Sequence, residues 1–114
     1  MAAAKFELDN IFLIVDKNNF QQTGSTEEIM QLNNLEDKWK SFGWNSETID
    51  GHNIDEIINY FSNIKNTKKP NALIMNTIKG KGFSFSEKNN DWHHAVLTKK
   101  LYEEAVKELD KNDN

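Results

Sequence analysis

The sequence predicts an α/β fold, a partial doubly wound parallel sheet of about three strands with flanking helices. Short apolar runs rich in β-branched residues alternate with longer stretches whose apolar residues recur at helical spacing. Two of these runs, 11–15 (IFLIV) and 71–77 (NALIMNT), are apolar on both sides of a strand. Strands of that kind suit a parallel sheet that is covered on both faces.

The expected elements follow the order strand, loop, helix, strand, helix, strand, loop, helix. By residue they are a strand at 11–15, a short capped turn near 25–28, a helix over about 34–42, a strand at 44–49, a helix over about 54–64, a strand at 71–77 and a helix over about 98–109. The strand at 44–49 is polar enough to lie near a sheet edge. A long loop punctuated by glycines precedes the last helix.

Residues that start or stop helices bound these elements. Ser25 or Thr26 can cap the short turn, and Asn53 can cap the helix that follows it in the middle of the chain. Gly43 ends one helix, and Pro70 blocks the continuation of another. The residues expected to face inward are Leu35, Trp39 and Phe42 in the first helix, Ile54, Ile57, Ile58, Phe61 and Ile64 in the second, and Leu101, Ala105, Val106 and Leu109 in the last.

Composition excludes several classes of function. The 114 residues carry a formal net charge of −4, and the 14 basic residues are spread along the chain. Nucleic acids and anionic membranes need a concentrated basic face, so neither is expected as a partner. The chain has no cysteine, which excludes disulfides and thiolate metal sites. No apolar run approaches the length of a membrane span, so we expect a cytoplasmic protein.

The predicted sheet has too few helices to cover it. A parallel sheet needs helices on both faces, and about three helices can hardly cover its strands. The pattern therefore predicts half of a doubly wound domain, whose exposed edge and uncovered face would invite a partner.

Polar residues follow the first strand at its carboxyl end, where ligands bind in open α/β sheets. Asp16, Asn18 and Asn19 offer hard oxygen donors of the kind that Mg²⁺ and Ca²⁺ favour. Asp and Asn also stop strands and cap turns for ordinary structural reasons. The residues alone leave both interpretations open.

The loop after the third strand carries two further features. Gly80 and Gly82, flanked by lysines, permit close approach of the backbone to a phosphate, although such a pair is also common in plain turns. In Trp92-His93-His94 the two rings point different ways in an extended chain, so one histidine can act on a substrate while the other faces solvent. The alternative is a partly exposed loop histidine beside an anchoring tryptophan.

Other catalytic arrangements are missing from the sequence. It holds no paired acids for glycosidase chemistry, no serine nucleophile elbow and no zinc quartet, and His52 is expected in a turn. The chemistry is therefore expected to come from a cofactor.

Five stretches of the chain, in order and suitably spaced, resemble the diphosphate-binding domain of transketolase. They are KFELDNIFLIVDKNNFQQTGSTEEIM, LEDKWKSFGW, IDGHNIDEI, KPNALIMNTIKGKGFSF and NNDWHHAVLTKKLYEEA. The resemblance is greatest to the N-terminal subunit of the split bacterial and archaeal forms. Residues 1–109 would be the C-terminal portion of that domain within a thiamine diphosphate-binding fold, and 110–114 a frayed polar tail.

The resemblance implies thiamine diphosphate and a divalent cation, Mg²⁺ or Ca²⁺. It also implies transfer of a two-carbon ketol unit from a ketose phosphate to an aldose phosphate. The Asn18 side chain and the Phe20 backbone carbonyl would bind the metal, and His93 would contact the diphosphate and the reacting sugar. Gly80 and Gly82 would shape the loop over the cofactor. His94 stands where many relatives have glycine, so it receives no role.

The family signature begins with Gly-Asp-Gly, and that part is absent from this sequence. The resemblance therefore implies complementary chains, namely an upstream half with Gly-Asp-Gly and a pyrimidine-binding subunit, and an oligomer. The chain would then be an enzyme component that is inactive alone. The alternative is a truncated, non-catalytic remnant that acts only as a binding or scaffolding module.

Overall fold

The computed structural model describes residues 1–65 and 67–112. The chain divides into two compact units, which are described separately. Unit 1 comprises Met1–Asn18 and Gln31–Thr77, and unit 2 comprises Asn19–Met30 and the chain from Ile78 onward.

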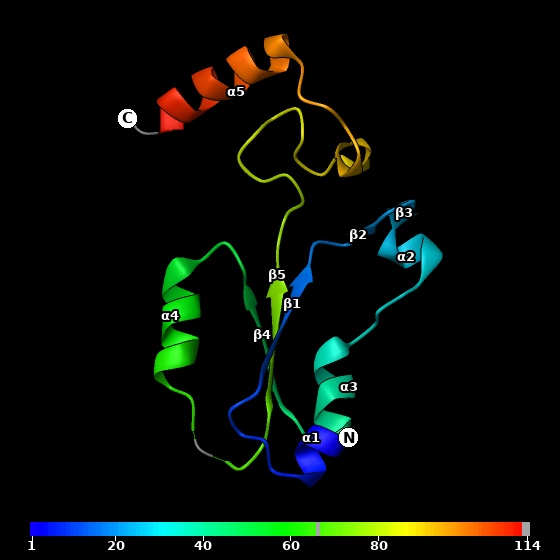
Figure 1. Ribbon diagram of the computed structural model, residues 1–114, viewed down its shortest axis with the longest axis vertical. Helices are drawn as coiled ribbons and strands as arrows, with labels where there is room; N and C mark the ends of the chain where they lie inside the picture. The colour runs from blue at the N-terminus through cyan, green and yellow to red at the C-terminus, as the bar shows by residue number, and fades with distance from the viewer. Residues whose placement is uncertain (66, 113–114) are drawn as a thin grey trace. The chain divides into compact units, whose positions relative to one another are not determined.

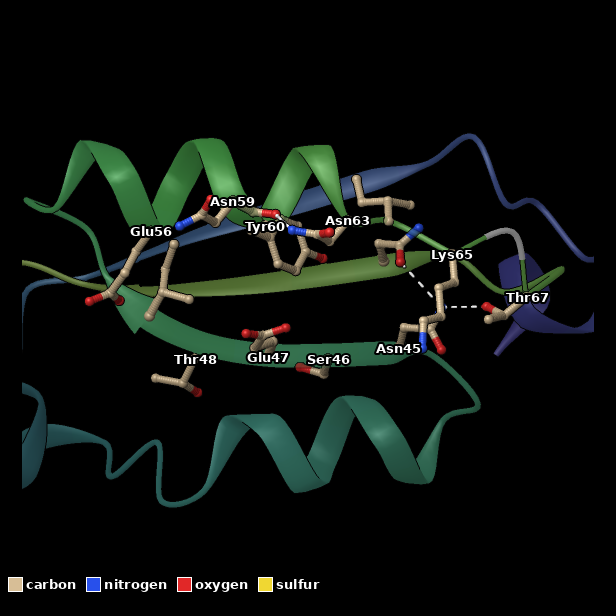
Figure 2. A pocket seen from close by; sticks show the side chains of 13 residues that line it. Asn45, Ser46, Glu47, Thr48, Glu56, Asn59, Tyr60, Asn63, Lys65 and Thr67 are labelled. Atoms are coloured by element: carbon tan, nitrogen blue, oxygen red, sulfur yellow. Dashed lines mark hydrogen bonds between the residues drawn. The ribbon is translucent and has the colours of Figure 1, made fainter.

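Unit 1 is a parallel sheet with helices on both faces (Figure 1). Its strands are β1 (Phe12–Lys17), β4 (Asn45–Asp50) and β5 (Asn71–Asn76), and its helices are α1 (Ala2–Lys5), α3 (Leu35–Ser41) and α4 (Ile54–Ser62). The 3 strands stand in the order β1-β5-β4, and both pairings are parallel. Figures 1 and 2 show α3 and α4 on opposite faces of the sheet. The predicted α/β fold with a partial parallel sheet is confirmed.

The strand β5 is the buried centre of unit 1. Its residue Asn71 stands opposite Phe12 of β1 and Asn45 of β4, which sets the register on both sides. Ala72 is 0%, Leu73 2% and Ile74 1% exposed. Hydrogen bonding on both sides aligns the carboxyl ends of all the strands in this sheet.

Unit 2 contains a β-hairpin, helices and a long loop. Its elements are β2 (Phe20–Gln21), β3 (Gly24–Ser25), α2 (Thr26–Ile29), the 3₁₀ helix η1 (Asn90–His93) and α5 (Lys99–Asn112). The strands β2 and β3 pair antiparallel. This hairpin was not predicted, because each of its strands is only two residues long.

The predicted caps and breakers are found at their expected positions. Asn53 Oδ1 accepts hydrogen bonds from the amides of Asp55 (3.1 Å) and Glu56 (3.2 Å), so Asn53 caps α4. Ser25 is the cap of α2, as one of the two predicted alternatives. Gly43 follows α3 with a φ of +85°, a left-handed conformation that glycine adopts readily.

The expectation that the first strand is covered on both faces is wrong for this chain. Phe12 is 43% and Ile14 53% exposed, and burial alternates along β1. The physical reason is position, since β1 lies at the edge of the sheet and α4 packs against β4. The predicted edge position of the strand near 44–49 is confirmed, because β4 forms the opposite edge.

Several helix residues expected to face inward are also exposed. They are Phe42 (48%), Ile54 (65%), Ile58 (55%), Phe61 (40%), Val106 (37%) and Leu109 (49%). Ile57 and Ile64 are partly buried and Ala105 is buried, so each apolar stripe is wider than the surface that covers it.

The last helix, α5, extends further along the chain than the helix predicted over about 98–109. Thr98 Oγ1 accepts from the Leu101 amide (3.3 Å) at the start of α5, near the expected boundary. The helix continues to Asn112, and the rest of the predicted tail at 110–114 lies outside the described residues. Within the described residues, no helix is both long enough and apolar enough to span a membrane.

Replacing Asn53 with alanine should destabilise unit 1. The Asn53→Ala variant loses the side-chain acceptor for two amides of α4, which we expect to lower the free energy of unfolding by about 1 kcal/mol. Urea denaturation followed by circular dichroism measures this. The matched control is Asn59→Ala, an exposed position within the same helix, which should be neutral. Equal losses in the two variants would contradict the cap.

Candidate functional site

The carboxyl ends of the strands in unit 1 are tied together by hydrogen bonds. The Thr77 hydroxyl donates to the Asp16 carboxylate, and the Thr77 amide donates to the Lys17 carbonyl (3.2 Å). On the other side of β5, the Gly51 amide donates to the Asn76 carbonyl (2.8 Å). The Asp16 carboxylate was one of the predicted metal-binding oxygen groups. In the structure it accepts a hydrogen bond that joins β1 to Thr77, the residue after β5.

Asn18 and Asn19 follow β1 directly and differ in conformation. Asn19 has a φ of +64°, a left-handed conformation in which asparagine is enriched among non-glycine residues. This gives Asn19 the ordinary turn role that was one of the two interpretations. Asn18 is partly buried and is the last residue of the first segment of unit 1.

Phe20 is the first residue of the hairpin in unit 2, and its backbone carbonyl points away from the partner strand β3. Phe20 stands opposite Ser25, and the Thr26 amide donates to the Asn19 carbonyl (3.0 Å). In an antiparallel ladder this bond makes Phe20 and Ser25 a non-hydrogen-bonded pair. The Phe20 carbonyl is therefore directed away from β3.

The predicted glycine pair has two different structural roles. Gly80 has a φ of +70°, and a Cβ at this position would clash with the Ser86 carbonyl oxygen. Ser86 is buried, and its hydroxyl donates to the Gly80 carbonyl (3.0 Å). Gly82 has a φ of +104°, and a Cβ there would meet nothing within 4 Å. Gly80 thus closes the loop, while Gly82 leaves its backbone accessible.

His93 is held at the end of η1 by an anchored tryptophan. The Trp92 indole nitrogen donates to the Phe85 carbonyl (2.9 Å), and the two rings lie 5.0 Å apart. The exposed rings of His93 and His94 lie 4.5 Å apart and nearly perpendicular, at 84°. His52 lies in a turn, where its amide donates to the Asp50 carboxylate (2.9 Å).

Asn90 is a candidate site residue that the sequence analysis missed. Its side-chain nitrogen donates to the Gln22 carbonyl (3.5 Å), which links η1 to the turn of the hairpin. Its side-chain oxygen is buried and has no hydrogen-bond partner among the described residues. A buried polar atom of this kind calls for an explanation. In the sequence, the polar run Asn89-Asn90-Asp91 before Trp92 was the one signal that could have pointed to Asn90.

A hydrogen-bonded carboxylate fastens the loop to the last helix. The Ser84 hydroxyl and amide (2.8 Å) both donate to Glu108 of α5. These hydrogen bonds hold the pKa of Glu108 below its usual range, because they favour the charged form. The contact fixes the helix against the loop that carries the glycine pair.

A cleft of about 590 Å³ in unit 1 contains none of the predicted site residues. It runs along the outer side of β4 beneath α4 (Figure 2). Burial, followed by the Glu47 carboxylate, raises the pKa of Tyr60 in this cleft. The lining is rich in amide and carboxylate side chains, with Asn45, Glu47, Glu56, Asn59 and Asn63 among them.

The candidate site residues belong to both units. Asn18 lies in unit 1, whereas Phe20, Gly80, Gly82 and His93 lie in unit 2, where Asn90 links the hairpin to η1. Over residues 1–65 and 67–112, no group of three His, Cys, Asp or Glu side chains is placed to hold a metal ion.

The sequence matches a known protein family over nearly its whole length. The family profile described as "Transketolase, thiamine diphosphate binding domain" matches residues 1–112. The chain belongs to the transketolase family.

Two similar curated proteins are subunits of split transketolases. The chain is 44% identical over 110 residues to a subunit of the apulose-4-phosphate transketolase of Phocaeicola vulgatus, covering 96% of this chain and 39% of that one. It is 45% identical over 112 residues to the 6-deoxy-6-sulfo-D-fructose transketolase subunit SqwG of a Clostridium species, covering 97% and 41%. The chain therefore spans about two fifths of the length of these relatives.

A solved transketolase has the same fold over the shared region. The crystal structure from Campylobacter jejuni matches with a TM-score of 0.83 and 27% identity, covering 93% of this chain and 17% of that one. The resemblance to transketolase that the sequence motifs indicated is confirmed.

Alanine substitutions at Gly80 and Gly82 should separate their structural roles. Both variants place a side chain at positive φ, which destabilises each by about 1–2 kcal/mol. Gly80→Ala also forces Ser86 to move, so we expect a greater loss of protection at the Lys88 amide, which donates to the Lys79 carbonyl (2.8 Å). Amide hydrogen exchange measures this. Equal effects of Gly80→Ala and Gly82→Ala would contradict the close approach at Gly80.

The contact between Glu108 and Ser84 should depend on pH. Because the folded pKa of Glu108 is lowered, its stabilisation is fully present above the unfolded pKa of about 4.3 and is lost as the pH falls through the lower folded value. An NMR titration of the Glu108 side-chain carbonyl should show a depressed pKa that returns toward normal in Ser84→Ala. An unchanged pKa in that variant would contradict the assignment.

Proposed function

We propose that this chain is one component of a transketolase that uses thiamine diphosphate and a divalent cation. The complete enzyme would transfer a two-carbon ketol unit from a ketose phosphate to an aldose phosphate. The observation that carries the proposal is the match of the thiamine diphosphate-binding domain over residues 1–112. Relatives named for apulose 4-phosphate and for a sulfo-sugar support an anionic sugar as substrate.

The proposed metal ligands are neutral oxygens. The Asn18 side-chain oxygen and the Phe20 carbonyl, two residues apart in the sequence, would bind Mg²⁺ or Ca²⁺, since both cations favour oxygen donors. The outward direction of the Phe20 carbonyl supports its part. The Asp16 carboxylate already accepts a hydrogen bond from the Thr77 hydroxyl. We therefore propose that the charged ligand of the metal comes from a complementary chain.

The loop of unit 2 would hold the diphosphate and the sugar. The accessible backbone at Gly82 and the closed turn at Gly80 would shape the cradle, and His93, fixed beside the anchored Trp92, would contact the diphosphate and exchange protons with the sugar. Thiamine diphosphate, when bound, would supply the carbon centre that carries the two-carbon unit.

Reconstitution with the other parts of a transketolase tests this function. The chain is combined with the part of the Phocaeicola vulgatus protein that lies outside its match to this chain, and with a pyrimidine-binding subunit; ketol transfer is then measured with Mg²⁺. We expect activity in the combination and none from the chain alone, because a charged metal ligand and the pyrimidine site come from elsewhere. Asn18→Ala should lower the activity at least about tenfold, through weaker metal binding.

The control variant is Gln22→Ala, which keeps the backbone carbonyl that Asn90 contacts and removes an exposed side chain. It should retain full activity. A combination that assembles but transfers no ketol unit would contradict the proposal and favour the alternative of a scaffolding remnant.

A further inference from the structure

The cleft between β4 and α4 is the feature of unit 1 to which the proposed function gives no role. Its volume of about 590 Å³ falls among those of small-molecule sites, which are roughly 300–1,000 Å³. The buried Ile49 and the partly buried Ile64 supply aliphatic surface in its lining. The residues proposed for the cofactor do not line it, so a ligand in this cleft would bind through other side chains.

Several hydrogen-bond acceptors in the cleft are free. Figure 2 shows Tyr60 and Asn63 on the side of α4 that faces the sheet, and Glu47 on β4. Within the described residues, neither the Glu47 carboxylate nor the Tyr60 hydroxyl has a hydrogen-bond or ion-pair partner. The Asn63 side-chain nitrogen donates to the Asn59 carbonyl (2.8 Å), which leaves the Asn63 side-chain oxygen available to a ligand.

The charges in the lining favour a positively charged ligand. Glu56 accepts from the Asp50 amide (2.9 Å) through one carboxylate oxygen and from the Asn53 side chain (3.0 Å) through the other. Glu47 is therefore the carboxylate that remains free to bind a ligand. The lining also contains Lys65, so its two carboxylates outnumber its ammonium group.

The Tyr60 ring provides a surface on which a cation can bind. It meets the Phe61 ring edge to face, with the ring centres 5.2 Å apart at an angle of 87°, which restricts its orientation. Burial, followed by the Glu47 carboxylate, raises the pKa of Tyr60, so the phenol stays neutral at physiological pH. The face of a tyrosine ring attracts organic cations, most strongly where the site is partly shielded from water.

We propose that this cleft binds a small aliphatic amine in its protonated form. The ammonium group donates to the Glu47 carboxylate and to the Asn63 side-chain oxygen, and it lies against the Tyr60 ring. The carbon chain packs on Ile49 and Ile64. The inference goes beyond the proposed function, because this binding requires no cofactor, metal ion or partner chain.

Other classes of ligand fit the lining less well. A divalent cation needs several oxygen ligands with carboxylates among them, and both Glu56 oxygens already accept hydrogen bonds. An anion would have Lys65 as its cationic partner and would be repelled by two carboxylates. A neutral polyol could bond to the amides but would leave the charge of Glu47 without a counter-ion.

An NMR titration of the ¹⁵N-labelled chain with putrescine, an aliphatic diamine, tests the site at constant ionic strength. We expect saturable shifts of the side-chain amides of Asn59 and Asn63 and of the Glu47 backbone amide. Butanediol, the uncharged analogue, should bind at least about tenfold more weakly, because it cannot form a charge-assisted hydrogen bond with Glu47. Equal binding of the diol, or shifts without saturation, would overturn the proposal. Tighter binding of an acetylated lysine amide than of putrescine would assign the cleft to a lysine side chain of a protein and contradict a small-molecule ligand.

Charge variants test whether Glu47 itself binds the amine. Glu47→Gln keeps the shape of the side chain and should weaken putrescine binding about tenfold. The matched control Asp55→Asn removes one charge from an exposed residue of α4 outside the lining, and it should leave the dissociation constant unchanged. Lys65→Gln should tighten binding, because it removes a positive charge from the lining.

Circular dichroism checks that these variants remain folded. Equal losses in Glu47→Gln and Asp55→Asn would show attraction to the net charge of the chain and would overturn the proposed site. Unaltered affinity of Glu47→Gln would do the same.

Discussion

The sheet of unit 1 depends on the hydrogen bonding of β5 on both of its sides. Buried Ala72, Leu73 and Ile74 hold β5 at the centre, and its register aligns the ends of β1 and β4. That alignment lets Thr77 bond to Asp16 on one side and the Asn76 carbonyl accept from Gly51 on the other. Because β5 uses both of its edges inside the chain, any extension of the sheet must occur at β1 or β4, and their side chains differ in polarity.

Much of the fold was predictable from local chemistry. The apolar run at 71–77 predicted a buried strand, and Gly43 and Asn53 marked helix boundaries because their conformational and capping preferences act locally. The polar sequence at 44–49 indicated an edge, and β4 is one. The small number of helices predicted an uncovered face, but periodicity did not show that Phe12, Ile14 and Ile58 lie on it, because periodicity shows only that a face is apolar.

The candidate site was predictable only in its residue types. The pattern at Asn18-Asn19 could not show whether these residues form a turn or bind a metal ion. In the structure, Asn19 adopts the left-handed turn conformation. The roles of Gly80 and Gly82 differ through contacts with Ser86, a residue without any local signal. Asn90 was missed because its link to Gln22 joins residues far apart in the sequence. In each case a tertiary contact decided what the local pattern left open.

The central proposal is that this chain carries the neutral part of a cofactor site whose charged part comes from a complementary chain. Calorimetric titration of thiamine diphosphate with Mg²⁺ tests it directly, on the chain alone and on the chain combined with the unmatched part of a split relative and a pyrimidine-binding subunit. The account predicts no appreciable binding by the chain alone and tight, Mg²⁺-dependent binding by the combination, because an amide and a carbonyl without a carboxylate hold a divalent cation weakly. Tight, Mg²⁺-dependent binding by the isolated chain would contradict it.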